Sequence, residues 1–572
     1  MFNSNMLSNS DFFTGAFPSE YGNALSGVFD INLRTGNNTK REYVIQLGSY
    51  GVDFGAEGPF TKGKKASYLF NYRYSTYGLL QDLLPQVTGL PSYSDLSLKL
   101  NFPTKNAGVF SFWSINGMGS IHYVNEKDTS KWETNYDSYD YDIHYNLTAS
   151  GLNHRTTIGN SSYLFSSVSF SATEYINRNT YFKPDLKEIP VSDQNEVDYK
   201  YSFSSFLNHK FNNRHTNKTG LIVNRIQYKY DVAANTDVAD NDRLDFFVKS
   251  SDFAYHYQFY SQSKIKLTKN IDINSGLHFL LLTTNNEVNI EPRIGINLQL
   301  TEKNRFSFAY GKHSKIEPLR IYLMEIKTDS GFEILNKNLN LTKAHHFILG
   351  YDWKITQDLH LRFEPYYQKL FDVPVIQDSS FSMINYDNEM YFSSQLFSKG
   401  KGTNIGIDIT LERFMKNGYY YLLTTSLFDS KYIGGDGVER NTRYNQNLVL
   451  NILGGKEWQT KKNNTFSLNG KFTILGGRRY APIDVEKSIS SQFVVYDNSR
   501  VFEVQAPTNY YVDISMNYTI NKSKWSHSII LQIKNLLLQK ELLGHAYNFR
   551  SNSIEPYELT IMFPYISYKI FF

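Results

Sequence analysis

Apolar and polar side chains alternate with a period of two along much of the chain. Between residues 65 and 74 the even positions are Ala, Tyr or Phe, while the odd positions are mostly polar. The same alternation recurs in segments 95–102, 271–279, 293–300, 405–411, 465–474 and 512–520. A period of two places alternate side chains on opposite faces of a β-strand. Because helical patterns of comparable length are missing from the sequence, it predicts an all-β protein.

The connections between these segments alternate between short and long. Ten are short and polar: 59–64, 103–108, 153–161, 212–218, 268–270, 301–304, 356–358, 416–418, 460–464 and 521–524. Eleven form the other set, most of them long: 49–50, 77–93, 119–140, 174–196, 232–249, 284–289, 313–341, 372–400, 430–441, 476–507 and 537–555. Ten inner turns and eleven outer connections join twenty-two strands.

This arrangement is typical of a bacterial outer-membrane barrel, which has an even number of antiparallel strands, short periplasmic turns and long extracellular loops. The sequence therefore predicts a transmembrane antiparallel β-barrel of about 22 strands in the cell outer membrane. No apolar run approaches the ~18 residues of a membrane-spanning helix. The apolar face should point to lipid. We expect eight side chains to point outward and to be exposed: Tyr68, Phe70, Leu98, Ile273, Ile296, Ile407, Leu468 and Ile514.

Composition narrows the functional classes. The chain of 572 residues has 44 Tyr, 41 Phe and 5 Trp, which suits the aromatic girdles of a membrane barrel. It has no Cys, so disulfides, thiolate metal sites and cysteine nucleophiles are excluded. The 59 Lys and Arg nearly balance the 55 Asp and Glu, so no nucleic-acid partner is expected.

The C-terminus ends in an alternating strand. Ile566, Tyr568, Ile570 and Phe572 are apolar, with polar residues between the first three. A last strand that ends in an aromatic residue resembles the signal by which the barrel-assembly machinery recognises outer-membrane barrels. The alternative is an ordinary edge strand that ends in Phe.

The segment 11–36, DFFTGAFPSEYGNALSGVFDINLRTG, resembles the end of the plug domain of TonB-dependent receptors in the form found in Bacteroidetes. The residues that carry the resemblance are Gly15, Pro18, Tyr21, Gly22 and Gly27. Further matches lie at 338–351 (NLNLTKAHHFILGY), 364–375 (EPYYQKLFDVPV), 476–484 (GGRRYAPID) and 532–537 (QIKNLL). The alternative for the first segment is an N-terminal tail with ordinary turn glycines.

The resemblance implies a twenty-two-stranded barrel filled by a plug, with residues 1–40 as the C-terminal remnant of the plug and 41–572 as the barrel. Most of the plug, the TonB box and the signal peptide are expected to be missing, so the TonB complex would act only through that missing part. Such receptors import a scarce solute, here an iron chelate, oligosaccharide, cobalamin or peptide. A passive porin and a surface adhesion or scaffold barrel remain alternatives.

Motifs for catalysis or cofactor binding give no candidates. The sequence has no Walker A, Gly-x-Ser-x-Gly or dinucleotide motif, and the neighbours His345 and His346 would point to opposite faces of a strand. We therefore expect no enzyme, no cofactor and no metal. Arg478, Arg479 and Tyr480 open an outer loop, where paired guanidinium groups would suit an anionic solute or lipopolysaccharide phosphate. A solvated loop base, or bonds to the barrel's own carboxylates, is the alternative.

Overall fold

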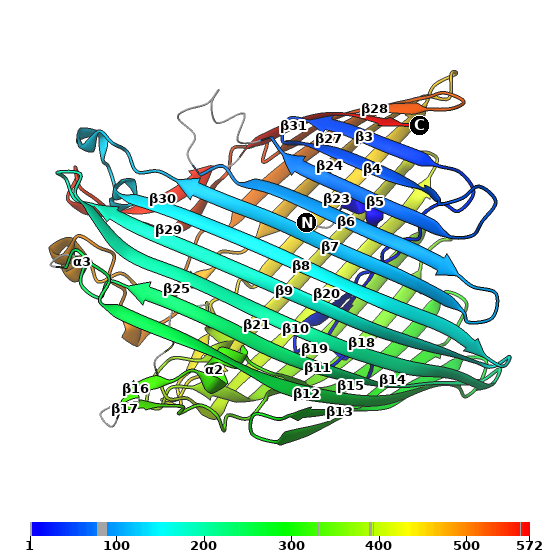
Figure 1. The fold of residues 1–572 in the computed structure, drawn as a ribbon, viewed down its shortest axis with the longest axis horizontal. Helices are drawn as coiled ribbons and strands as arrows, with labels where there is room; N and C mark the ends of the chain where they lie inside the picture. Colours follow the sequence, from blue (N-terminus) through cyan, green and yellow to red (C-terminus); the bar gives the residue numbers. More distant parts are fainter. Residues whose placement is uncertain are drawn as a thin grey trace.

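The strands form one closed barrel with short turns at one end and long loops at the other (Figure 1). The computed structural model describes residues 3–76, 89–238, 241–328, 331–387, 392, 394–560 and 562–572. The wall has twenty-two antiparallel strands in this part of the chain: β3 (Glu42–Gly48), β4 (Gly51–Pro59), β5 (Ser67–Ser75), β6 (Ser92–Pro103), β7 (Val109–Tyr123), β8 (Tyr139–Ile158), β9 (Ser162–Phe182), β10 (Glu188–Asn212), β11 (His215–Ala234), β12 (Phe246–Lys266), β13 (Ile271–Leu282), β14 (Glu287–Gln299), β15 (Asn304–Lys315), β18 (Thr342–Lys354), β19 (Leu359–Val375), β20 (Phe397–Lys416), β21 (Tyr419–Ile433), β23 (Leu448–Gln459), β24 (Thr465–Leu475), β27 (Asn509–Asn521), β28 (Ser526–Lys534) and β31 (Phe563–Phe571).

Short elements lie in the lumen and in the loops. They are η1 (Ser4–Met6), β1 (Asp11–Thr14), β2 (Gly27–Asp30), η2 (Thr129–Lys131), η3 (Asn135–Ser138), α2 (Leu319–Leu323), β16 (Ile326–Thr328), β17 (Gly331–Glu333), η4 (Met383–Asn385), β22 (Glu439–Asn441), β25 (Arg479–Tyr480), α3 (Val485–Ser491), η5 (Asn498–Arg500), β26 (Val504–Gln505), β29 (Lys540–Asn548) and β30 (Ser553–Thr560). Among the described residues, no helix is both long enough and apolar enough to cross a membrane.

The predicted fold class is confirmed, and the barrel closes by pairing of β3 with β31. All ten predicted short turns join consecutive wall strands. The loop predicted at 77–93 falls largely outside the described residues. The segment 174–196 was expected to be a loop, but β9 continues to Phe182 and β10 begins at Glu188. Strands β8 to β12 have 20 to 25 residues, against the ~9–11 that cross a bilayer, so the wall extends beyond the membrane and carries polar residues there.

The alternation separates the two faces of the wall. In β5, Tyr68 and Phe70 are half-buried on the outer face, whereas Ser67 and Leu69 are buried on the inner face, near η1. Of the eight side chains predicted to be exposed to lipid, Leu468 is exposed, at 36%, and the other seven are half-buried. Neighbouring outward side chains cover part of the other seven.

The C-terminal strand follows the predicted alternation. Ile566 and Tyr568 are exposed on the outer face, and the Phe572 ring stacks on Tyr43 with 5.4 Å between centroids. Ile570 pairs with Ile45 of β3 at the closure of the barrel. Lys569, between Tyr568 and Ile570, points into the lumen, and its Nζ donates to Oδ1 of Asn5 at 2.9 Å.

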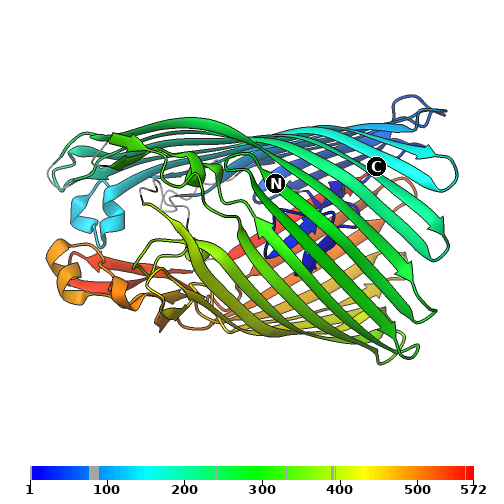
Figure 2. The same ribbon diagram turned by 90° about the horizontal axis from the view of Figure 1, so that it is seen from below.

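The segment of residues 3–36 lies inside the barrel, ahead of the first wall strand at Glu42 (Figure 2). Its strands β1 and β2 form a two-stranded hairpin, paired from Asp11↔Asp30 to Thr14↔Gly27. We call residues 3–36 the luminal segment.

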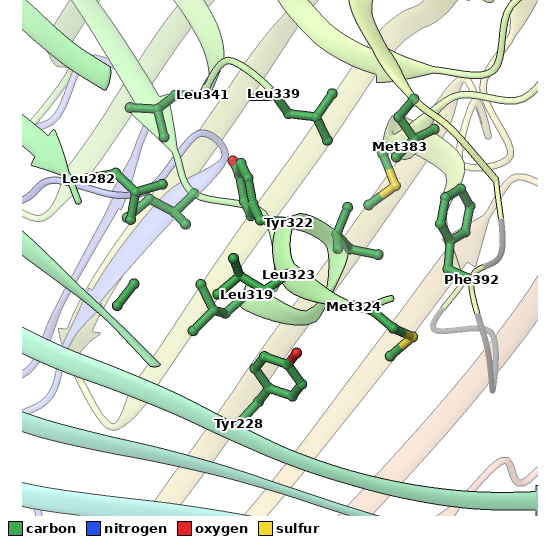
Figure 3. Close-up of a cluster of buried hydrophobic side chains, with 14 of the residues drawn as sticks. Tyr228, Leu282, Leu319, Tyr322, Leu323, Met324, Leu339, Leu341, Met383 and Phe392 are labelled. Atoms are coloured by element: carbon green, nitrogen blue, oxygen red, sulfur yellow. The ribbon is translucent and has the colours of Figure 1, made fainter. Parts of the chain in front are cut away.

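Two outer loops fold inward and pack against the inner wall. The loop that carries α2 and the loop that carries η4 contribute buried apolar residues, and β11 to β13 contribute others (Figure 3). This loop cluster includes Tyr228, Leu280, Leu282, Leu319, Tyr322, Leu323, Met324, Leu339, Leu341, Met383, Phe392 and Leu396. Tyr322 and Leu282 are fully buried. The loop cluster narrows the extracellular mouth on the side of these strands.

Candidate functional site

Five inward side chains from neighbouring strands form a polar cluster that meets the luminal segment. They are Gln258 of β12, His278 of β13, Glu291 and Arg293 of β14, and His346 of β18. The strand period of two turns all five toward the lumen, and the antiparallel register aligns them. We call these residues the wall cluster.

Arg293 is the main contact between the wall and the luminal segment. Its Nη1 donates to the backbone carbonyls of Phe17 at 3.2 Å, Pro18 at 2.6 Å and Tyr21 at 2.6 Å. Its guanidinium also lies 5.0 Å from the centre of the Phe17 ring, which is buried. One cation therefore holds a tight turn of the luminal segment by its backbone and by an aromatic face.

Glu291 orients Arg293 and the rest of the wall cluster. Its Oε2 accepts from Arg293 Nη2 at 2.5 Å and lies 3.0 Å from His278 Nδ1. Its Oε1 accepts from Asn289 at 3.0 Å and from Ser314 Oγ. The side chain is fully buried, so this network compensates a charge that would otherwise be costly in the interior.

Contacts on both sides of Arg293 extend the attachment. The backbone N–H of Ala16 donates to His346 Nδ1 at 3.1 Å, and that of Ser19 donates to Gln262 Oε1 at 2.6 Å. Glu20 forms an ion pair with Lys218 of β11. Residues 16–21 are thus bound along strands β11 to β18.

The glycines of the resemblance lie where a side chain would not fit. A Cβ on Gly22 would overlap His278 and Gln258, and a Cβ on Gly27 would come 2.8 Å from the carbonyl oxygen of Phe13. Gly15 has φ of +67°, a conformation that favours glycine.

The other two residues of the resemblance are held by their backbone and by one side chain. The Pro18 and Tyr21 carbonyls accept from Arg293. Tyr21 OH donates to Asp30 at 2.8 Å, and burial, with help from Glu20 and Asp30, raises the pKa of Tyr21. The tyrosine therefore stays neutral and links the turn to β2.

The luminal segment also contacts the wall near β3. Lys99 of β6 donates to the Leu33 carbonyl at 2.6 Å, and Arg34 pairs with Glu57 of β4 at 2.7 Å. Asn3 donates to Asp53, also of β4. Strands β4 and β14 are ten positions apart in a wall of twenty-two, so the luminal segment crosses the lumen from one side to the other.

A cavity of about 400 Å³ lies beside Thr14, between the luminal segment and strands β18 to β21. Its lining combines two carboxylates, amides, a hydroxyl and aromatic rings, including Glu364, Tyr366, Gln368, Asn404, Asp408, Phe428, Ser430 and Tyr444. Polar and aromatic groups of this kind suit a hydrophilic solute.

The predicted loop residues 478–480 do not converge on one site. Arg479 Nε donates to the Asn445 carbonyl at 3.0 Å and its Nη2 donates to Asn447 Oδ1 at 3.1 Å, so it binds a neighbouring loop. Tyr480 packs against the ring of His545, and Arg478 is exposed. A shared anion site at these residues stays a prediction.

No group of three or more metal-ligating residues converges within the part of the chain that the structure describes. His345 and His346 face opposite sides of β18: His346 is buried against the luminal segment, whereas His345 lies beside Tyr310 OH at 3.1 Å.

No protein-family model matches the sequence, and no curated protein matches it. Solved structures show the same fold. The chain is similar to the ferric yersiniabactin uptake receptor FyuA from Yersinia pestis, with 12% identity and a TM-score of 0.69 over 96% of this chain and 82% of that one. It is similar to the ferric preacinetobactin receptor BauA from Acinetobacter baumannii, with 10% identity and a TM-score of 0.68 over 99% and 85%. It is also similar to the ferric-catecholate import receptor Fiu from Escherichia coli K12, with 9% identity and a TM-score of 0.69 over 97% of this chain and 85% of that one.

These neighbours are TonB-dependent outer-membrane receptors, and identities of this size show a shared fold. The inverted polarity of the wall agrees with that comparison, because apolar side chains face outward and polar ones face the lumen. Fold and polarity together assign the barrel to the outer membrane.

Sequence analysis missed the wall cluster. Its members lie on four strands between residues 258 and 346, and each is an ordinary polar residue on the inward face. The available signal was the pair Glu291 and Arg293, two opposite charges on the same face of one strand. The backbone carbonyls that Arg293 binds in the luminal segment lie more than 270 residues away in the sequence.

Proposed function

We propose that this chain is the barrel of a TonB-dependent importer and that residues 1–40 are the C-terminal part of its plug, in a receptor of the Bacteroidetes type. The observation that carries the proposal is the attachment of the luminal segment by Arg293. A passive porin needs a water-filled lumen, whereas here a backbone segment crosses the lumen and is bound to the wall at β14. A gated pore needs a segment that closes the lumen and can be released. Non-covalent contacts to the wall hold such a segment in the closed state and can be broken when the gate opens.

The imported solute belongs to the class that porins exclude by size: an iron chelate, oligosaccharide, cobalamin or peptide. Ferric chelates should be tested first, because the structural neighbours are named as receptors for ferric chelates. The cavity beside Thr14 supports passage of a hydrophilic solute along β18 to β21, since its lining offers both hydrogen-bond acceptors and aromatic faces.

Uptake by whole cells tests the proposal. Cells that carry the chain in its natural reading frame are supplied with labelled members of each solute class, with and without a functional TonB complex. We expect uptake of one class that depends on TonB and on the solute concentration in a saturable way. The double variant Arg293→Met/Glu291→Gln should abolish coupled uptake without leaving a buried, unpaired carboxylate.

The matched control is Arg305→Ala. Arg305 also faces inward and pairs with Asp352 at 2.9 Å, but on the periplasmic side of the luminal segment. Passive entry of many small solutes in all variants would contradict an importer and favour a porin. No uptake, together with binding of proteins or glycans by the loops, would favour an adhesion barrel.

A further inference from the structure

Two buried histidines of the inner wall contact the luminal segment where it is docked. His346 of β18 and His313 of β15 are both fully buried, and their ring centroids are 4.6 Å apart. The His313 ring also packs against the ring of Phe17, with 4.2 Å between centroids. His346 instead contacts the backbone of Ala16. We call His313 and His346 the imidazole pair.

The hydrogen bond at His346 requires a neutral ring. Its Nδ1 accepts from the backbone N–H of Ala16 at 3.1 Å. Because a backbone N–H can only donate, Nδ1 must carry a lone pair, and the proton of the neutral ring lies on Nε2. A second proton would occupy Nδ1 and turn two N–H groups toward each other. Docking at Ala16 therefore excludes the imidazolium form of His346.

His313 lies in surroundings that suit only a neutral ring. Neither of its ring nitrogens has a hydrogen-bond partner among the described residues. A neutral imidazole is tolerated there because its ring packs on Phe17 and His346. An imidazolium would be a buried charge without an acceptor, which is costly. Release of Phe17 would open the ring to water and remove this cost.

The charges around the imidazole pair oppose a further proton. The titratable groups that act on the pair are Arg293 of β14, His278 of β13 and His345 of β18. Arg293 is a permanent cation and repels an imidazolium. The carboxylate of the wall cluster, Glu291, already accepts from Arg293 Nη2 at 2.5 Å and lies 3.0 Å from His278 Nδ1.

The remaining elements packed against the pair add no anion. Strand β19 places the neutral Gln368 opposite His346, and the luminal segment contributes the uncharged residues 15–17. His345 lies on the outer face, paired in register with Lys312 of β15 and Lys369 of β19. A proton on either ring of the pair would therefore lack a counter-charge while the segment is docked.

We propose that the imidazole pair is a pH-sensitive latch, which holds the luminal segment while both rings are neutral and releases it when acid protonates them. The docked state binds fewer protons than the released state, so docking weakens as the pH falls. An imidazole in water has a pKa of about 6.5. A fall from about pH 7.5 to about pH 5 therefore weakens docking about 30-fold for each ring that is protonated only after release, and about 900-fold for two.

The latch acts on the attachment of the luminal segment itself, and it rests on the proposed function only for its consequence in uptake. In an importer, acid would ease the release on which gating depends. The two proposals can fail separately. Uptake that does not depend on TonB would contradict the importer and leave the latch, whereas docking that ignores pH would contradict the latch and leave the importer.

Thiol accessibility in the purified full chain in detergent tests the latch. Ser19→Cys places a single thiol on the docked turn, where the natural side chain is 1% exposed, and Ser26→Cys places one at an exposed position of the same segment. The rate of modification by methyl methanethiosulfonate at Ser19→Cys is divided by the rate at Ser26→Cys. This ratio reports how often the turn is released, and it cancels the pH dependence of the thiol. Between about pH 7.5 and about pH 5 we expect the ratio to rise more than about 100-fold.

Neutral replacements of the two rings should remove the rise in steps. His346→Asn keeps an oxygen acceptor near the position of Nδ1 but cannot be protonated, and His313→Gln is also neutral. Each should reduce the rise to about 30-fold, and the double variant should reduce it to less than about threefold. His345→Asn is the matched control, because His345 lies on the opposite face of the same strand, and it should keep the full rise.

Three results would overturn the latch. One is a rise of less than about threefold with both histidines present. Another is a full rise in the double variant, which would assign the pH dependence to carboxylates such as Glu20. The third is an equal loss of the rise in His345→Asn and His346→Asn. Heat-modifiable migration in gels at both pH values confirms that each variant is a folded barrel.

Discussion

At the scale of single residues, the absence of a side chain at Gly22 is what lets the luminal segment lie directly on the wall. Gly22→Ala forces His278 and Gln258 to move, and both belong to a buried hydrogen-bond network. Overpacking of this kind costs about 1–3 kcal/mol, and we expect it to weaken docking of the luminal segment by that amount. The natural chain has no cysteine, so Ser26→Cys introduces a single site for a spin label. The label should be more mobile in the Gly22→Ala variant than in the chain that keeps Gly22.

Gly295→Ala is the control for this change. It lies on the same inner wall, but its added methyl group would have 4.0 Å to its nearest neighbours. Unchanged label mobility in Gly22→Ala would show that the turn is not held by close contact.

A second residue-scale prediction concerns pH. Arg440 of β22 donates to Asp436, in the loop before that strand, at 3.0 and 2.7 Å, and these hydrogen bonds hold the pKa of Asp436 below its usual value. A carboxyl with a lowered folded-state pKa stabilises the fold above its unfolded value, about 3.9, and loses that contribution as the pH falls through the folded value. For this partly exposed pair we expect at most about 1 kcal/mol.

Hydrogen exchange of residues 434–441 measures this effect. After correction for the pH dependence of intrinsic amide exchange, the protection factors of these residues should fall in acid for the natural chain and stay constant for Asp436→Asn. The same acid loss in both would place the cause elsewhere.

At the scale of elements, the two faces of each strand tolerate different substitutions. Ile296 of β14 faces outward five residues before the turn at 301–303, which places it about 12 Å above the periplasmic edge of the membrane. Ile296→Arg should lower the free energy of unfolding by about 2–4 kcal/mol, the cost near mid-bilayer. Urea unfolding in lipid vesicles measures it.

Asn297→Arg is the matched change on the other face. It points into the lumen opposite Asp272, where water and a carboxylate accept the cation. A cost as large for Asn297→Arg as for Ile296→Arg would mean that the faces are wrongly assigned.

The elements were predictable because their cause is local. The alternation in β5 and the polar turn at 301–304 are set by neighbours in sequence, and the structure has both where the sequence predicts them. The ends of β9 and β10 were missed because polar strands above the membrane have no apolar face to mark them. The inward fold of α2 was missed as well, because α2 packs against β11 and β12, which lie far away in the sequence.

At the scale of the whole molecule, the luminal segment divides the lumen, since it is covalently joined to the wall at β3 and held at β14 by non-covalent contacts alone. Release of the distal contacts should let it swing aside. Reconstituted in planar bilayers, Arg293→Met/Glu291→Gln should therefore conduct more ions than the natural chain, and Arg305→Ala should not. The loop cluster limits the increase, because it narrows the mouth independently of the luminal segment.

A reversible cross-link separates this swing from a general loosening of the barrel. Glu20 of the luminal segment is in contact with Lys218 of β11, and the natural chain has no cysteine that would react with a cross-linker. With both changed to Cys in the Arg293→Met/Glu291→Gln background, a short disulfide-forming bifunctional reagent should return the conductance to the natural level, and a reductant should raise it again. Conductance that stays high after cross-linking would mean that ions pass beside the luminal segment, through the side of the lumen near β19 to β28. Movement of the segment would then not be the gate.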